Sequence, residues 1–139
     1  MRRSPFLLGL LLVFATHSNA HEVRPALLKI SEMNDGRYLV HWKVPAMGNK
    51  RLAIDPVFDV QCQQVDDRVN GFAAGASVRS WVVNCGNTLA GTTIGFSNLS
   101  STMIDVLVQV TFLDGRYYTG LVRPNAPKFS VPSRDGRAS

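Results

Sequence analysis

The chain has 139 residues, of which 45% are hydrophobic, 15 are Lys or Arg and 10 are Asp or Glu. This length allows one modest domain and excludes the larger enzyme folds. The formal net charge of +5 comes from basic residues spread along the chain rather than gathered in a stripe, so the composition does not indicate a nucleic-acid partner.

Residues 1–20 have the pattern of a cleaved signal peptide. Two arginines precede an apolar run over residues 6–15, and the segment ends in Ser-Asn-Ala, the small-x-small pattern that signal peptidase accepts. The apolar run is too short for a membrane-spanning helix, which needs about 20 residues. We therefore expect a periplasmic or secreted protein, cleaved after Ala20, whose mature chain begins at His21.

The first two predicted strands, residues 23–32 and 37–44, form a hairpin whose register depends on its turn. A two-residue loop would place Lys29 opposite Trp42, whereas a three-residue loop with Gly36 left-handed places apolar residues opposite each other. The preferred pairs are Leu28 with Trp42 and Ile30 with Val40. In this register Tyr38, Val40, Trp42 and Val44 are predicted to face the core, and Arg37, His41 and Lys43 to face mostly outward.

The middle of the chain contains short runs rich in Val, Ile, Phe and Trp that alternate with turn residues, which is typical of all-β proteins. Residues 50–60 predict a strand interrupted at Pro56, and the polar, Gly- and Ala-rich residues 61–75 are expected to be the least structured segment. Two further strands are predicted at residues 77–85, with Trp81, Val83 and Cys85 on one side, and at residues 88–96.

The last part of the chain has the clearest strand pattern. Residues 104–112 place apolar side chains on one face, and Asp114-Gly115 predicts a hairpin into residues 116–122. We therefore expect an all-β fold, a single β-sandwich over residues 21–132, followed by a disordered tail at residues 133–139. The architecture is predicted to be immunoglobulin-like, although the cysteine spacing differs from that of true immunoglobulin domains.

The only two cysteines, Cys62 and Cys85, are expected to form one disulfide, because an exported chain matures in an oxidising compartment. A bond between them would close a loop of about 24 residues and contribute about 3 kcal/mol through loop-closure entropy. Two buried free thiols are the alternative. A zinc site is a weaker one, because no Cys-x-x-Cys pair or nearby His supplies further ligands.

Two histidines remain after signal cleavage, His21 and His41. A terminal His21 offers an α-amino group and a ring nitrogen to one ion, a chelate suited to Cu(II) and Ni(II). His41 is a second ligand only if the fold brings it near, and the preferred register places it outward, opposite Lys29. The alternative is that His21 is an exposed terminus and His41 an exposed strand residue.

The sequence shows no catalytic constellation. No Ser lies in a Gly-x-Ser-x-Gly elbow, and the Gly residues near 71–75 lack the setting of a phosphate loop. Four acidic residues could suggest a calcium site, but their spacing fits no calcium-loop motif, so we expect them to lie in a solvated loop: Asp55, Asp59, Asp66 and Asp67. We expect a protein that is not an enzyme, and no substrate is identified.

Several short strings in order along residues 21–132 resemble a known family. They are HEVRPA from His21, GRY from Gly36, WKVP from Trp42, Arg51-Leu52, Asp55-Pro56, the Trp81 to Cys85 segment, DVLV from Asp105, and Asp114-Gly115. In this order they resemble the start of HupE/UreJ-type membrane proteins. The resemblance implies an extracytoplasmic β-domain that precedes a bundle of membrane helices, in a family associated with hydrogenase and urease accessory roles and with nickel or cobalt transport.

The sequence departs from the family pattern after Pro132, where the helices and their transport motif do not follow, so transport is not carried over to this chain. The preferred hypothesis is a non-enzymatic periplasmic accessory or interaction domain, whose partner is a membrane protein that supplies the helices. The alternative is a small Cu or Ni carrier that uses His21. A copper enzyme is a third hypothesis, which needs His41 as a second ligand.

Overall fold

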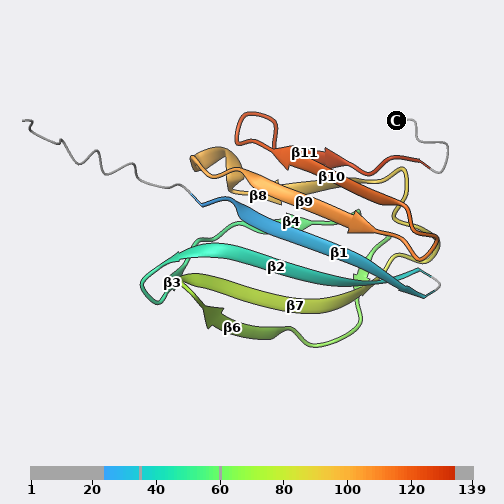
Figure 1. Cartoon of the computed structure of the whole chain (residues 1–139), viewed down its shortest axis with the longest axis horizontal. Coiled ribbons are helices and arrows are strands. Elements are labelled where there is room, and N and C mark those ends of the chain that lie inside the picture. The colour runs from blue at the N-terminus through green and yellow to red at the C-terminus, as the bar shows by residue number, and fades with distance from the viewer. Residues whose placement is uncertain (1–23, 35, 60, 134–139) are drawn as a thin grey trace, which may run out of the picture.

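The computed structural model describes residues 24–34, 36–59 and 61–133 and shows an all-β sandwich (Figure 1). The predicted signal peptide, His21 and residues 134–139 of the predicted tail lie outside these ranges. The elements in chain order are β1 (Ala26–Asn34), β2 (Arg37–Met47), β3 (Lys50–Arg51), β4 (Asp55–Val57), β5 (Gln63–Gln64), β6 (Val69–Ala73), β7 (Ala76–Asn84), β8 (Thr93–Ser97), the 3-10 helix η1 (Leu99–Ser101), β9 (Val106–Thr111), β10 (Tyr117–Val122) and β11 (Lys128–Ser130).

The two sheets differ in size. The large sheet has the strand order β10-β9-β1-β2-β7-β5, with β3 on β2 and β6 on β7, and the small sheet has the order β11-β8-β4. In Figure 1 the large sheet lies in front, with β4 and β8 behind it. Strand β1 lies at the centre, antiparallel to β2 and parallel to β9. The small sheet therefore covers one face of the large sheet, and no element of the described residues covers the other face.

The predicted register of the first hairpin is confirmed. Leu28 pairs with Trp42 and Ile30 pairs with Val40. Gly36 has a φ of +74°, the left-handed conformation that the three-residue loop requires. Because side chains alternate along a strand, this register turns every second residue of β1 and β2 toward the small sheet.

The core lies between the two sheets, on the faces that the sequence predicts. Tyr38, Val40, Trp42 and Val44 of β2 are fully buried. The β9 face, the β7 face with Trp81, and residues of the small sheet complete one apolar cluster. The indole Nε1 of Trp42 donates a hydrogen bond to the Ile54 carbonyl at 3.0 Å, so the polar group of this buried ring is satisfied.

A second buried hydrogen bond fixes the loop before β8. The backbone N–H of Leu89 donates to the Tyr38 Oη at 3.0 Å, and both side chains are fully buried. We predict that Tyr38→Phe lowers the free energy of unfolding by about 1–3 kcal/mol, because the Leu89 N–H loses its partner where water has little access. Urea unfolding would measure the effect. Tyr117→Phe, at a tyrosine that is 54% exposed, is the control and should leave the midpoint unchanged.

Three predicted segments need correction. Residues 50–60 are not one strand, because the chain leaves the large sheet after β3 and enters the small sheet as β4, where Pro56 lies on an edge strand. Residues 61–75 contain β5 and β6, both paired with β7. The predicted strand at 88–96 begins only at Thr93. One further strand, β11, has no counterpart among the predicted strands and pairs with β8.

Candidate functional site

The predicted disulfide is present between Cys62 and Cys85. Cys85 is 1% exposed and belongs to the core cluster, with Cys62 packed against it. The alternatives of two free thiols and of a zinc site are therefore excluded. The bond joins the residue just before β5 to the residue just after β7, and so cross-links two paired strands of the large sheet.

The two histidines have different outcomes. His21 lies outside the described residues, so its role as a Cu or Ni ligand stays a prediction. His41 is on β2, opposite Lys29 as predicted, and its Nδ1 lies 3.0 Å from the Ser80 Oγ. Within the described ranges, no three His, Cys, Asp or Glu side chains are grouped as metal ligands would be.

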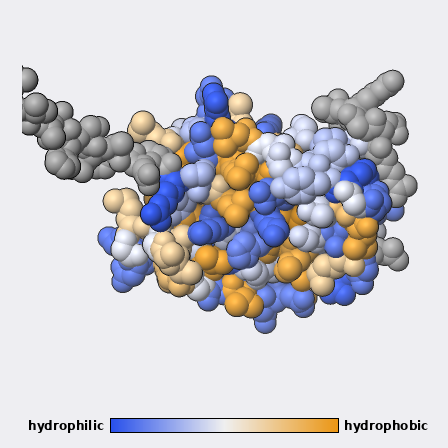
Figure 2. Space-filling view, in the orientation of Figure 1, coloured by the Kyte–Doolittle hydropathy of each residue, from blue (hydrophilic) through white to orange (hydrophobic). Residues whose placement is uncertain are grey.

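On the face of the large sheet opposite the small sheet lie the side chains that alternate along each strand with the core residues. Its residues align across the strands in three rows. We call these rows together the outer face: the first is Leu121, Leu107, Leu27, Lys43 and Val78; the second is Thr119, Gln109, Lys29, His41 and Ser80; the third is Tyr117, Thr111, Ser31, Leu39 and Val82. Figure 2 views this side of the domain and shows hydrophobic and hydrophilic patches interleaved on it.

The outer face exposes large apolar side chains. Leu39 is 42% exposed, Leu121 is 51% exposed and Tyr117 is 54% exposed. They lie in the first and third rows, on either side of the polar second row. Adjacent rows are separated by two residues along each strand, which is about 6.6 Å. The face is therefore a polar band between two largely apolar rows.

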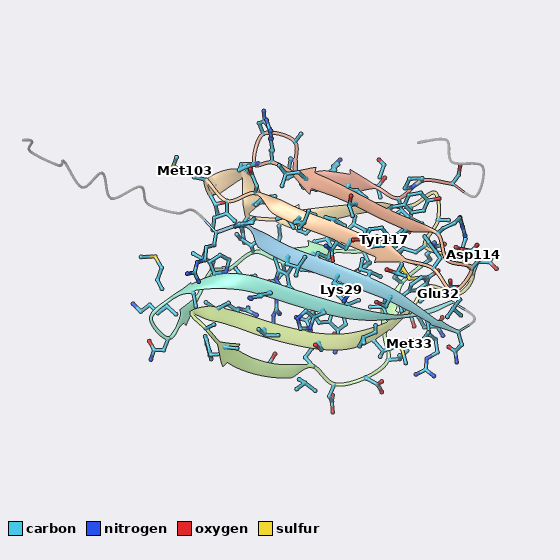
Figure 3. All side chains as sticks on the ribbon, viewed as in Figure 1. Lys29, Glu32, Met33, Met103, Asp114 and Tyr117 are labelled. Atoms are coloured by element: carbon cyan, nitrogen blue, oxygen red, sulfur yellow. A yellow bond between two sulfur atoms is a disulfide. The ribbon has the colours of Figure 1, made fainter. Side chains whose placement is uncertain are left out.

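The charge of the outer face is one-sided. Lys29 and Lys43 are exposed, and His41 lies beside them. The strands of the large sheet, within their described bounds, contain a single carboxylate, that of Glu32. Its Oε2 accepts a hydrogen bond from the Leu113 N–H at 2.8 Å. Figure 3 places Glu32 with Asp114 at the hairpin end of the sheet, away from Lys29 in mid-strand. The positive charge of the outer face therefore has no facing carboxylate on the described strands of the sheet.

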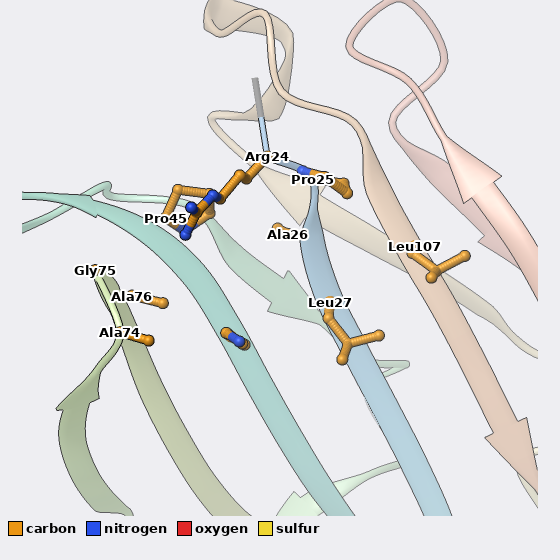
Figure 4. Close-up of a pocket in the computed structure, with 10 residues that line it drawn as sticks. Arg24, Pro25, Ala26, Leu27, Pro45, Ala74, Gly75, Ala76 and Leu107 are labelled. Atoms are coloured by element: carbon orange, nitrogen blue, oxygen red, sulfur yellow. The ribbon is translucent and has the colours of Figure 1, made fainter. Parts of the chain in front are cut away.

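A pocket of about 260 Å³ continues the first row past the start of β1 (Figure 4). Arg24, Pro25 and Leu27 form one wall, Pro45 lies across from them, and the turn at Ala74-Gly75 lies near Pro45. Leu27 and Leu107 belong both to this pocket and to the outer face. The apolar surface is thus continuous from the pocket onto the sheet.

Neither the protein-family models nor the curated proteins include a match to this chain. Among the residues that the structure describes, no helix has the length and apolar character needed to cross a membrane.

The sequence patterns predict only some members of the outer face, and they do not predict the face itself. The alternation in the first hairpin predicts that His41 and Lys43 point outward, and the β9 pattern places Leu107 opposite the core. Their alignment depends on the parallel pairing of β1 with β9, and these two strands lie far apart in the sequence. No local pattern indicates that pairing.

Proposed function

We propose that this chain is a non-enzymatic, exported interaction domain of the HupE/UreJ type, and that its outer face docks onto a membrane protein. The main support for the proposal is that one sheet face combines exposed apolar side chains with lysines that face no carboxylate on the described strands. Contiguous apolar surface that is rimmed or crossed by polar groups marks interaction sites.

The partner's chemistry follows from complementarity. The central band carries Lys29 and His41, and Lys43 lies in the adjoining first row, so a matching segment carries carboxylates near its centre. The flanking rows expose Leu39, Leu121 and Tyr117, so that segment also carries apolar side chains on both sides of its carboxylates. We therefore propose an acidic and apolar extracytoplasmic segment of a HupE/UreJ-type membrane protein as the occupant.

Lys29→Glu tests the docking. Lys29 is exposed at the centre of the band, and reversal of its charge should repel an acidic partner without disturbing the core behind it. We predict that the purified variant binds the HupE/UreJ-type membrane protein of the same genome, held in detergent, at least about tenfold more weakly than the unaltered protein. Biolayer interferometry at two salt concentrations measures both the affinity and its electrostatic part.

Lys128→Glu is the matched control, because it makes the same charge change on an exposed residue of β11 in the small sheet. Its affinity should stay within about twofold of the unaltered protein. Equal weakening by both variants would contradict docking through the outer face. Binding to protein-free vesicles of phosphatidylglycerol, with the same loss on Lys29→Glu, would assign the face to a lipid surface and overturn the proposed protein partner.

A further inference from the structure

Three arginines converge on a pocket at the edge of the large sheet, on the core side of β6 and β7. The pocket has a volume of about 390 Å³. Arg51 comes from β3, Arg79 from β7, and Arg68 from the segment just before β6. The remaining lining residues are Asn70, Gly71, Phe72 and Ser77. Such a volume lies in the range of small-molecule sites.

The Arg68 guanidinium is held in place before any ligand binds. Its carbon lies 4.6 Å from the centroid of the Trp81 ring, which is a stacking distance. Its Nε donates to the Gln64 Oε1 at 3.0 Å, and the Gln64 amide donates in turn to the Asp66 carbonyl at 2.8 Å. Because these contacts fix the guanidinium plane, less side-chain entropy is lost when it binds an oxyanion.

The Arg79 side chain is buried and only partly satisfied. It is 5% exposed, and its Nη2 is hydrogen-bonded to the Asp55 carboxylate. Its Nε is buried and has no hydrogen-bond partner among the described residues. A buried guanidinium that is only partly satisfied is costly, and the positive charge that it places in the wall of the pocket favours an anion there.

The charges around the pocket do not balance. Burial lowers the pKa of Arg79, the Asp55 hydrogen bond opposes this, and the charges of Arg51 and Arg68 lower the pKa further. Three guanidinium groups thus line the pocket, and among the described ion pairs only that of Arg79 with Asp55 offsets their charge. A ligand with two negative charges would neutralise the excess.

We propose that this pocket binds a small organic oxyanion with two negative charges. The guanidinium fork matches the geometry of carboxylate and phosphate groups, which accept two parallel hydrogen bonds. The pocket is larger than a single inorganic anion needs, and Phe72, which is 61% exposed, offers an apolar wall to a carbon skeleton. This site lies on the opposite side of the sheet from the outer face and does not depend on the docking proposed above.

Calorimetric titration of the purified protein at constant ionic strength tests the site. The probes are succinate and glycerol 3-phosphate, which distinguish a dicarboxylate from a phosphate ester, with sulfate and acetate for comparison. We expect saturable binding of at least one of the two organic dianions, and binding of sulfate and acetate at least about tenfold weaker. Sulfate that binds as tightly as the organic probes, or no saturable binding of any probe, would overturn the proposal.

Arg68→Gln should weaken the dianion that binds by at least about tenfold, because hydrogen bonds to charged groups are among the strongest. Arg68 is exposed, so its replacement should leave the fold intact, which circular dichroism verifies. Arg51 is also exposed, and Arg51→Gln should likewise weaken binding of the dianion. Arg123→Gln makes the same chemical change at an exposed residue outside the pocket, and its affinity should equal that of the unaltered protein. Equal affinities in all three variants would contradict the arginine site.

Discussion

Reduction of the Cys62–Cys85 disulfide is expected to lower the free energy of unfolding by about 3 kcal/mol. The two cysteines are separated by 23 positions, so the bond removes a large set of conformations from the unfolded chain. The closed loop contains all of β5, β6 and β7, which are strands at one edge of the large sheet. Urea unfolding with and without dithiothreitol would measure the difference.

The Cys62→Ala/Cys85→Ala variant separates the cross-link from other effects of the reductant. Its midpoint should fall by a similar amount and should no longer respond to dithiothreitol. An unaltered midpoint on reduction of the natural protein, with loss of the bond verified by thiol labelling, would show that the native packing of β7 does not depend on the cross-link.

The disulfide also supports the proposal that the domain is exported. Structural disulfides persist in oxidising compartments and are rare in the cytosol of most organisms. Cys85 is buried in the core, so a reduced chain would keep a free thiol there and lose the cross-link. The predicted signal peptide over residues 1–20 and the disulfide are independent features that point to the same compartment.

Local patterns were enough to predict the strands that alternate strictly. The first hairpin register follows from Gly36 and from the apolar residues on both sides of it, all of which lie within a short stretch of the chain. The buried face of β9, with Val106, Val108 and Val110, follows from the same alternation. In these strands each residue faces either the core or solvent, so the period of two is visible in the sequence.

Strands whose sequences do not alternate apolar and polar residues could not be predicted. All five residues of β6 are exposed, so no apolar period marks this strand. It is joined to β7 by a turn in which Ala74 and Gly75 both have positive φ. Alanine rarely adopts this conformation, so an alanine in the sequence does not predict such a turn. Strand β11 is short and lies among prolines; it pairs with β8, and its Phe129 ring packs against Gly120 of β10.

The candidate sites depend on tertiary structure even more strongly. Arg51, Arg68 and Arg79 are separated by many residues, and nothing in their spacing indicates a shared pocket. They meet because β6 folds back on β7 while β3 pairs with the end of β2 nearby. A sequence pattern identifies such a site only when its residues lie on one element or one loop.

Gly36→Ala is expected to destabilise the protein by about 3 kcal/mol or more, by two separable effects. Gly36 has a φ of +74°, where a side chain costs about 1–2 kcal/mol. A Cβ at this position would also lie 2.6 Å from the Gly86 carbonyl oxygen, which is backbone and cannot rotate away. Overpacking of this kind adds about 1–3 kcal/mol. Gly48→Ala isolates the first effect, because Gly48 has a φ of +65° and open space around its Cβ position.

Urea unfolding of the two variants should therefore give a larger loss for Gly36→Ala than for Gly48→Ala, and equal losses would contradict the close approach. The close approach involves Gly86, which follows Cys85, and the Cys85 N–H donates to the Gly36 carbonyl at 2.7 Å. The disulfide holds this segment in place, so a chain without it can move Gly86 away from a new methyl group. The cost of Gly36→Ala should then be smaller in the Cys62→Ala/Cys85→Ala background, and a double-mutant cycle would measure this coupling.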